Sequence, residues 1–102
     1  MTFADLTKTD KPVLIDFYAD WCAPCRAMKP ILEDVKSRLG EDVSIFKIDV
    51  EKNEMIAERF DIRSIPTLMI FKKGEPVWRK SGMASSQELI NAVRSFEPGP
   101  AE

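Results

Sequence analysis

The hydrophobic positions of the chain alternate between short apolar runs and runs with a helical period, which predicts a mixed fold of strands and helices. A largely apolar run from Val13 to Ala19 is too short for a helix and is typical of a strand buried on both faces. From Cys22 to Leu39 the apolar residues recur with a helical period, and Gly40 follows as a helix-ending residue. The sequence therefore predicts a strand that leads directly into a long helix.

The second half of the chain repeats this alternation with shorter elements. We expect strands over residues 43–50, 67–71 and 77–81, a helix over 53–60, and a hairpin turn at residues 72–75. Ser85 and Glu88 fit the two ends of a capping box, which predicts a last helix from residue 85. Residues 1–11 indicate a short helix or turn, and residues 97–102 a loose tail. Since strands joined by a crossover helix run parallel, the order predicts a mixed sheet with helices on both faces.

Composition narrows the class of protein. A chain of 102 residues is expected to form one domain, and its net charge of −2 gives no electrostatic footprint for nucleic acid or an anionic membrane. No apolar stretch approaches the roughly 20 residues of a membrane helix. The first residues carry no signal-peptide pattern, so we expect a cytoplasmic protein, or a periplasmic one if a signal peptide has been removed.

The segment Trp21-Cys22-Ala23-Pro24-Cys25 carries the clearest chemical signal, because it holds the only two cysteines. A strand that feeds a helix through C-x-x-C spacing is typical of a dithiol redox site. The unpaired N–H groups at the helix start favour a thiolate on Cys22, which is the form that attacks a disulfide. Cys25, one turn on, is close enough to attack the mixed disulfide that results.

Other uses of the two cysteines fit less well. A structural bridge across so short a loop removes little chain entropy. A zinc site needs about four ligands, and a chain without histidine offers only these two soft ones. A c-type haem site would need a histidine where Arg26 stands, and a Cys-His hydrolase is excluded by the same absence. No metal is therefore expected, and dithiol chemistry is the favoured interpretation.

The run from Asp16 to Cys25 resembles the active-site signature of the thioredoxin family. Further matches, spread over about residues 12–96, lie at Pro30, Lys47, Asp49, Ile65-Pro66-Thr67, Lys73-Gly74-Glu75 and Gly82. The resemblance implies the α/β thioredoxin fold and a protein-disulfide reductase of the electron-carrier type. It also implies a flavin-containing thioredoxin reductase as electron donor and protein disulfides as substrates. No bound cofactor is implied, since the Cys22–Cys25 pair itself carries the two electrons.

Two charged residues are candidates for proton transfer beside the dithiol. Asp16 sits in the middle of an apolar strand, where burial should raise its pKa and let it accept a proton from Cys25. The resemblance places a buried aspartate here in that role, with Lys47 beside it. The ordinary alternatives are a strand-end aspartate bonded to the backbone and an unremarkable strand lysine.

A group of mostly apolar residues should surround Cys22 and dock protein substrates. By itself Pro66 indicates only a strand start, but the resemblance implies a cis proline that packs on the dithiol. The Ile65 backbone would then pair with an extended substrate segment. We define the dithiol patch as Pro66 together with Trp21, Ala23, Pro24, Ile65, Gly82 and Met83. Arg26 and Lys29 are interpreted as a solvated helix face.

The chain departs from the family pattern at several points. Ala23 replaces a glycine between the cysteines, where residues help set the redox potential, and Tyr18 stands where tryptophan is usual. Thioredoxins usually carry an extra strand before the one that holds the buried acid. Too few residues precede Asp16 for that strand, so we expect four strands, with residues 43–50 at the sheet edge, and a monomer whose edge charges blunt self-pairing.

Two rival functions also fit the sequence. One is an oxidase or isomerase of protein disulfides, although a histidine between the cysteines would have pointed there. The other is a thioredoxin-like binding module without turnover, which would have no need of both Cys22 and Cys25. The reduction potential of the pair, measured alongside disulfide reduction, separates the three functions.

Overall fold

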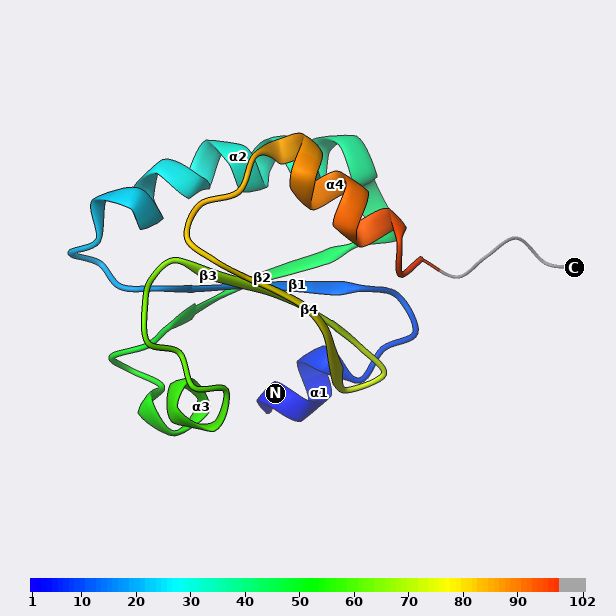
Figure 1. The fold of residues 1–102 in the computed structure, drawn as a ribbon. Helices are drawn as coiled ribbons and strands as arrows, with labels where there is room; N and C mark the ends of the chain where they lie inside the picture. The colour runs from blue at the N-terminus through cyan, green and yellow to red at the C-terminus, as the bar shows by residue number, and fades with distance from the viewer. Residues whose placement is uncertain (98–102) are drawn as a thin grey trace, which may run out of the picture.

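The computed structural model describes residues 1–97 and places a sheet between two pairs of helices (Figure 1). The elements, in chain order, are α1 (Phe3–Thr7), β1 (Val13–Tyr18), α2 (Ala23–Leu39), the 3₁₀ turn η1 (Gly40–Asp42), β2 (Ser44–Asp49), α3 (Glu54–Arg59), β3 (Thr67–Lys72), β4 (Glu75–Ser81) and α4 (Ser86–Arg94). Helices α2 and α4 cover one face of the sheet, and α1 and α3 the other (Figure 1). Most of the predicted loose tail, residues 98–102, lies outside the described residues.

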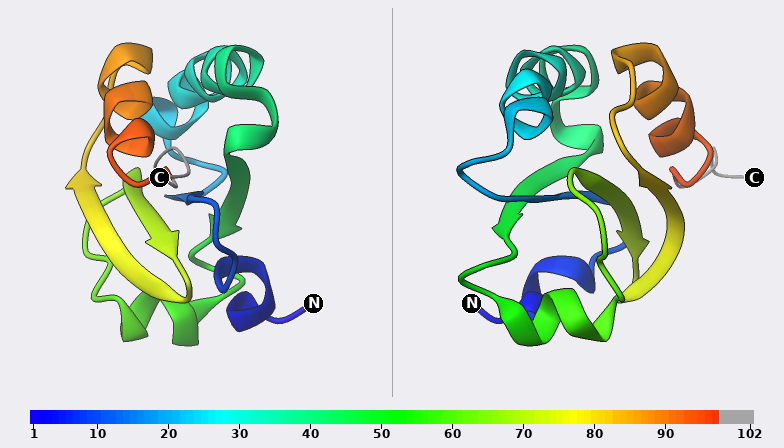
Figure 2. Two further views of the ribbon diagram at one scale, coloured as in Figure 1. Left: turned by 90° about the vertical axis from the view of Figure 1, so that its right-hand side faces the viewer. Right: turned by 60° about the vertical axis from the view of Figure 1, so that its left-hand side comes forward.

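The sheet has four strands in the order β2-β1-β3-β4. Strand β1 pairs in parallel with β2 and antiparallel with β3, and β3 and β4 form the antiparallel hairpin. Figure 2 (left) shows β2 in green and β4 in yellow at opposite edges. The predicted mixed sheet is therefore confirmed, with the strand over residues 44–49 at an edge.

The first residues form a helix and not a fifth strand. Thr2 caps α1 by accepting a bond from the Asp5 N–H, and the Asp5 carboxylate accepts one from the Thr2 N–H. Phe3 then packs its ring on Phe71 of β3 and on Phe60 after α3, at centroid distances of 5.3 and 5.4 Å. Helix α1 therefore covers the sheet face that α3 also covers.

The side chains of β1 alternate between two cores. Leu14 joins the core under α2 and α4, whereas Val13, Ile15 and Phe17 join the aromatic core on the opposite face. All four are fully buried. The prediction of a strand buried on both faces is confirmed, and Asp16 points to the same side as Leu14 because strand side chains alternate.

The hairpin turn is shorter than predicted. The sequence predicts a turn over residues 72–75, but β3 extends to Lys72, β4 begins at Glu75, and only Lys73 and Gly74 connect them. Both have positive φ, 54° and 81°, as a two-residue hairpin turn of the tight primed type requires. Strand pairing thus continues through two residues that sequence chemistry assigned to the turn.

Helix α4 is tied to the sheet through its first turn. The Ser85 hydroxyl accepts a bond from the Glu88 N–H at 3.1 Å, which confirms Ser85 as the N-cap. The predicted capping box is only half formed, because the Glu88 carboxylate accepts bonds from Lys80 Nζ of β4, at 2.6 and 2.8 Å, and not from the Ser85 N–H. The Lys80–Glu88 contacts hold the first turn of α4 against β4.

Candidate functional site

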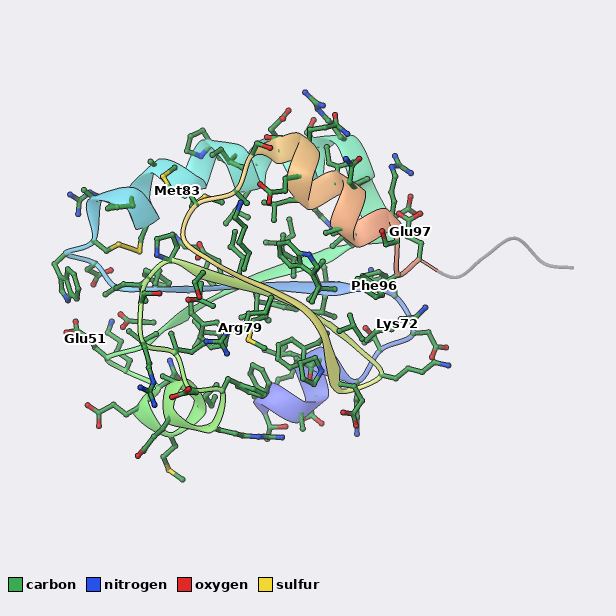
Figure 3. The ribbon with its side chains drawn as sticks, in the orientation of Figure 1. Glu51, Lys72, Arg79, Met83, Phe96 and Glu97 are labelled. Atoms are coloured by element: carbon green, nitrogen blue, oxygen red, sulfur yellow. A yellow bond between two sulfur atoms is a disulfide. The ribbon has the colours of Figure 1, made fainter. Side chains whose placement is uncertain are left out.

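The two cysteines lie at the start of α2, just after the loop that follows β1, and they form a disulfide (Figure 3). Cys22 is the N-cap of α2, and its Sγ accepts a bond from the Cys25 N–H at 3.2 Å. Both are nearly buried, with 4% and 2% of their surface exposed. A sulfur held at the helix N-terminus receives backbone N–H groups and the positive end of the helix dipole, which stabilise negative charge.

The loop before the cysteines is held by a residue that the sequence analysis assigned to solvent. The Arg26 guanidinium is exposed, yet its Nη1 donates to the Asp20 carbonyl oxygen at 2.7 Å. This bond connects the first turn of α2 back to the loop that carries Trp21. The sequence did not predict this contact, because nothing in the local pattern around Arg26 distinguishes it from a solvated helix residue.

Two distant loops bring the rest of the dithiol patch to Cys22. The Ile65 carbonyl oxygen lies 3.8 Å from Cys22 Sγ, and the Ile65–Pro66 peptide bond is cis, as the resemblance implies. The Pro66 carbonyl oxygen accepts a bond from the Gly82 N–H at 2.7 Å. The structure therefore places three chain segments, around residues 22, 65 and 82, against one another.

The outer part of this patch is open to solvent. Trp21 is 67% exposed and Met83, labelled in Figure 3 on the loop before α4, is 43% exposed. Ala23 and Pro24 are also exposed, but Pro66 is buried, so the proline belongs to the base of the patch and not to its surface. Large exposed apolar side chains grouped around a reactive centre are typical of a protein docking surface.

Asp16 is the unpaired acid of the core. It is fully buried, and neither carboxylate oxygen has a hydrogen-bond partner among residues 1–97. Burial raises the pKa of Asp16 to about 6, against the opposing effect of the nearby Lys47 charge. The raised pKa predicted from the sequence is confirmed, and its main cause is the loss of hydration of the charged form.

Lys47 is placed beside Asp16 by the register of the parallel strands. Its Nζ lies 4.4 Å from the centre of the Tyr18 ring, a cation–π contact that holds the ammonium over the ring. A small cavity of about 120 Å³ is lined by Lys47, Cys25, Tyr18, Ala19, Asp20 and Arg26. The cavity connects the second cysteine with the lysine, and Tyr18, noted in the sequence only as a family departure, is part of it.

Within residues 1–97 no group of three or more His, Cys, Asp or Glu side chains is placed to hold a metal ion. None of the helices in the same range is long and apolar enough to cross a membrane.

Comparisons with known proteins agree on one family. Residues 2–95 match the family model described as Thioredoxin. The chain is 46% identical over 91 residues to Thioredoxin-like protein slr0233 of Synechocystis, covering 89% of this chain and 87% of that protein. It is 47% identical over 90 residues, 88% of this chain, to chloroplastic Thioredoxin Y of rice, of which it spans only 54%.

Two further matches extend the comparison. A bifunctional thioredoxin reductase/thioredoxin of Mycobacterium leprae is 38% identical over 96 residues, which are 94% of this chain and 21% of that protein. The solved structure of a mutant thioredoxin from Halobacterium salinarum superposes with a TM-score of 0.84 at 33% identity, covering 96% of this chain and 85% of that one.

Proposed function

Given that this chain belongs to the thioredoxin family of oxidoreductases, we propose that it reduces disulfides of protein substrates through the Cys22–Cys25 pair. The resemblance predicted from the sequence is confirmed at the level of family and fold. One observation carries the proposal. A disulfide-forming pair begins helix α2, with the first cysteine as N-cap and a buried acid of raised pKa in the adjoining strand.

The proposed reaction has two exchange steps. In the reduced protein the Cys22 thiolate attacks one sulfur of a substrate disulfide, a mixed disulfide forms, and the first substrate sulfur leaves as a thiolate. Cys25 then attacks Cys22 Sγ, which releases the second substrate thiolate and closes the Cys22–Cys25 bond. Two electrons pass from the dithiol to the substrate. The structure corresponds to the oxidised product.

Asp16 and Lys47 are proposed to handle the proton of Cys25. With a pKa of about 6, Asp16 is mostly ionised near neutral pH and can accept a proton from the second thiol. Lys47 opposes the rise in the Asp16 pKa and so keeps the acid ionised.

Substrates are proposed to dock on the dithiol patch. Trp21 and Met83 offer exposed apolar surface, and Ala23 and Pro24 lie beside Cys22 in the chain. The Ile65 carbonyl, close to Cys22 Sγ, is positioned to accept a backbone hydrogen bond from an extended substrate segment. Gly82, bonded to Pro66, completes the patch. Shape and apolar contact would then matter more than substrate sequence.

The electron donor is proposed to be a flavin-containing thioredoxin reductase. The Mycobacterium leprae relative, named as a fusion of the two proteins, supports this pairing. We further propose a single-domain monomer working in the cytoplasm, where a reducing thiol pool keeps protein cysteines reduced. Light scattering and localisation of the tagged protein test these two statements.

Reduction of insulin disulfides, coupled to NADPH oxidation by a thioredoxin reductase, tests the proposed function. The parent protein should turn over, Cys22→Ser should be inactive, and Cys25→Ser should accumulate a mixed disulfide on Cys22. Asp16→Asn should keep the fold and slow turnover between about pH 6 and 9, because the base for Cys25 is lost. Turnover by Cys22→Ser would overturn the assignment of the nucleophile. Asp16→Asn kinetics equal to the parent across that range would leave Asp16 no role in catalysis.

The reduction potential of the pair separates a reductase from an oxidase. A reductase should equilibrate near the −270 mV scale of thioredoxins, and an oxidase near about −120 mV. Equilibration against glutathione buffers, read by alkylation of free thiols, measures it. Ala23→Gly, which restores the family residue, is the matched variant for the contribution of Ala23.

A further inference from the structure

The outer edge of β2 presents backbone groups without a partner. The Ser44 N–H donates to the Pro12 carbonyl oxygen and the Val50 N–H to the Tyr18 carbonyl oxygen. The backbone N–H and C=O groups of the even-numbered residues of this strand therefore point toward β1. Backbone groups alternate in direction along a strand, and the N–H and C=O of Ile45 and Lys47 therefore face away from the sheet. No other backbone group in residues 1–97 pairs with them.

A basic groove runs along this free edge, between α2 and β2. It encloses about 370 Å³ and is lined by Lys29, Leu32, Glu33, Lys36, Ile45 and Lys47. Leu32 is buried and Ile45 half-buried, so they form an apolar floor, while three lysines and one glutamate form the walls. Lys36 Nζ also donates to the Gly40 and Val43 carbonyls, which anchors that wall at one end.

We propose that this edge binds an extended, acidic segment of a partner protein, which adds to the sheet as a strand beside β2. The free N–H and C=O groups of Ile45 and Lys47 would supply the backbone ladder. Acidic side chains at alternate positions of the segment would point toward α2, on the face where Ile45 and Lys47 project, and meet the lysines of the groove.

Charge favours such a partner over a second copy of the chain. Two β2 edges brought together would place Lys47 and its groove lysines against the same residues of the other copy, and like charges across a strand pair are destabilising. An acidic segment instead meets a net positive groove. Lys29 is exposed and lines the groove, so its ammonium group is available to a ligand.

The probe is an end-blocked peptide of about six residues, the usual strand length, in which glutamate alternates with threonine. Titration calorimetry on the oxidised protein should show binding that weakens with salt. Amide exchange followed by NMR should show new protection at Ile45 and Lys47. N-methylation of the alternate peptide amides that point toward β2 should abolish binding, because it removes the N–H groups of the ladder. N-methylation of the other alternate amides, which point away from β2, should not. Equal binding by both methylated peptides would show attraction of charge without strand addition and would overturn the proposal.

Variants test the surface from the protein side. Lys29→Glu should weaken peptide binding about tenfold, because it reverses a charge in the groove, whereas Lys52→Glu, an exposed lysine outside the groove, should change it less than about twofold. Ile45→Pro removes an outward N–H and should abolish binding, and Ile45→Ala keeps that N–H as the matched control. No binding by the parent, or a dimer mass in light scattering that the peptide fails to reduce, would also overturn the proposal. Insulin reduction should be unchanged in Lys29→Glu, so failure here is separable from failure of the proposed function.

Discussion

Replacing Asp16 with asparagine should make the stability of the oxidised protein less dependent on pH. In the folded protein burial raises the pKa of Asp16 from an ordinary 3.8 to about 6. Between these values the unfolded chain has released the proton that the folded protein keeps. Unfolding then releases a proton, so stability falls as pH rises.

The rise in pKa sets the size of the effect. It corresponds to about 3 kcal/mol of unfolding free energy, fully present below pH 3.8 and lost once the pH has passed about 6. Asparagine does not ionise and carries no such slope. Its amide would enter the same site, where Asp16 finds no partner, and an unsatisfied buried group costs about 1–3 kcal/mol at every pH. The informative quantity is therefore the change with pH and not the offset between the proteins.

Urea unfolding of parent and variant, at steps from about pH 4 to 8, measures this change. Both proteins should be kept oxidised, so that Cys22 and Cys25 do not titrate. Because Asp16 in the unfolded chain is already partly ionised at about pH 4, the stability of Asp16→Asn relative to the parent should increase by about 2 kcal/mol across the range. Asp10→Asn, at an exposed aspartate, should run parallel to the parent. A constant difference between Asp16→Asn and the parent would refute the link between burial and the raised pKa.

Further predictions concern the N-cap, the hairpin, the α1 contact and the nucleophile. Ser85→Ala removes the cap bond to the Glu88 N–H and should lower the unfolding free energy by about 1 kcal/mol in urea titrations. An unchanged midpoint would show that the cap does not contribute to stability. Gly74→Ala should cost about 1–2 kcal/mol by the same assay, because φ is +81° while the nearest atom to an added Cβ, at 3.8 Å, leaves room; a neutral result would contradict the turn geometry. Phe3→Ala should cost about 2 kcal/mol by loss of its ring contacts, unless α1 contributes nothing to stability. Limiting iodoacetamide on the reduced protein at neutral pH should label Cys22 first, as mass spectrometry can show, and preferential labelling of Cys25 would reverse the two roles.

Local patterns in the sequence were sufficient for the elements and for the dithiol. The apolar run of β1 and the C-x-x-C segment each report on neighbours in the chain, so strand, helix start and redox pair could be predicted together. The burial of Asp16 could also be predicted from the sequence, because a residue in the middle of a strand that is apolar on both sides is buried with it. The family resemblance supplied the partners that no local pattern contains, Lys47 and Pro66.

What the sequence did not predict depends on side chains that meet across the fold. The Arg26 bond to Asp20 and the Lys47 contact with Tyr18 need the loop and the strand register to be known first. The hairpin turn was predicted too long because Lys72 and Glu75 have polar side chains, whereas pairing is decided by backbone geometry at Lys73 and Gly74. Polar residues next to a hairpin turn, such as Lys72 and Glu75, can belong to the paired strands as well as to the turn.

The bond from Gly82 to Pro66 has a consequence for how activity is lost when the protein is denatured. The two sulfurs are three residues apart, so an unfolded chain still contains a reducible pair. The proposed docking surface exists only while the loops around residues 22, 65 and 82 are assembled, and their contacts span more than half the sequence. The redox pair therefore depends on neighbouring residues only, whereas the proposed binding of a protein substrate depends on the folded chain. Reduction of insulin should therefore disappear along the global unfolding curve, while exchange with a small disulfide reagent persists beyond it.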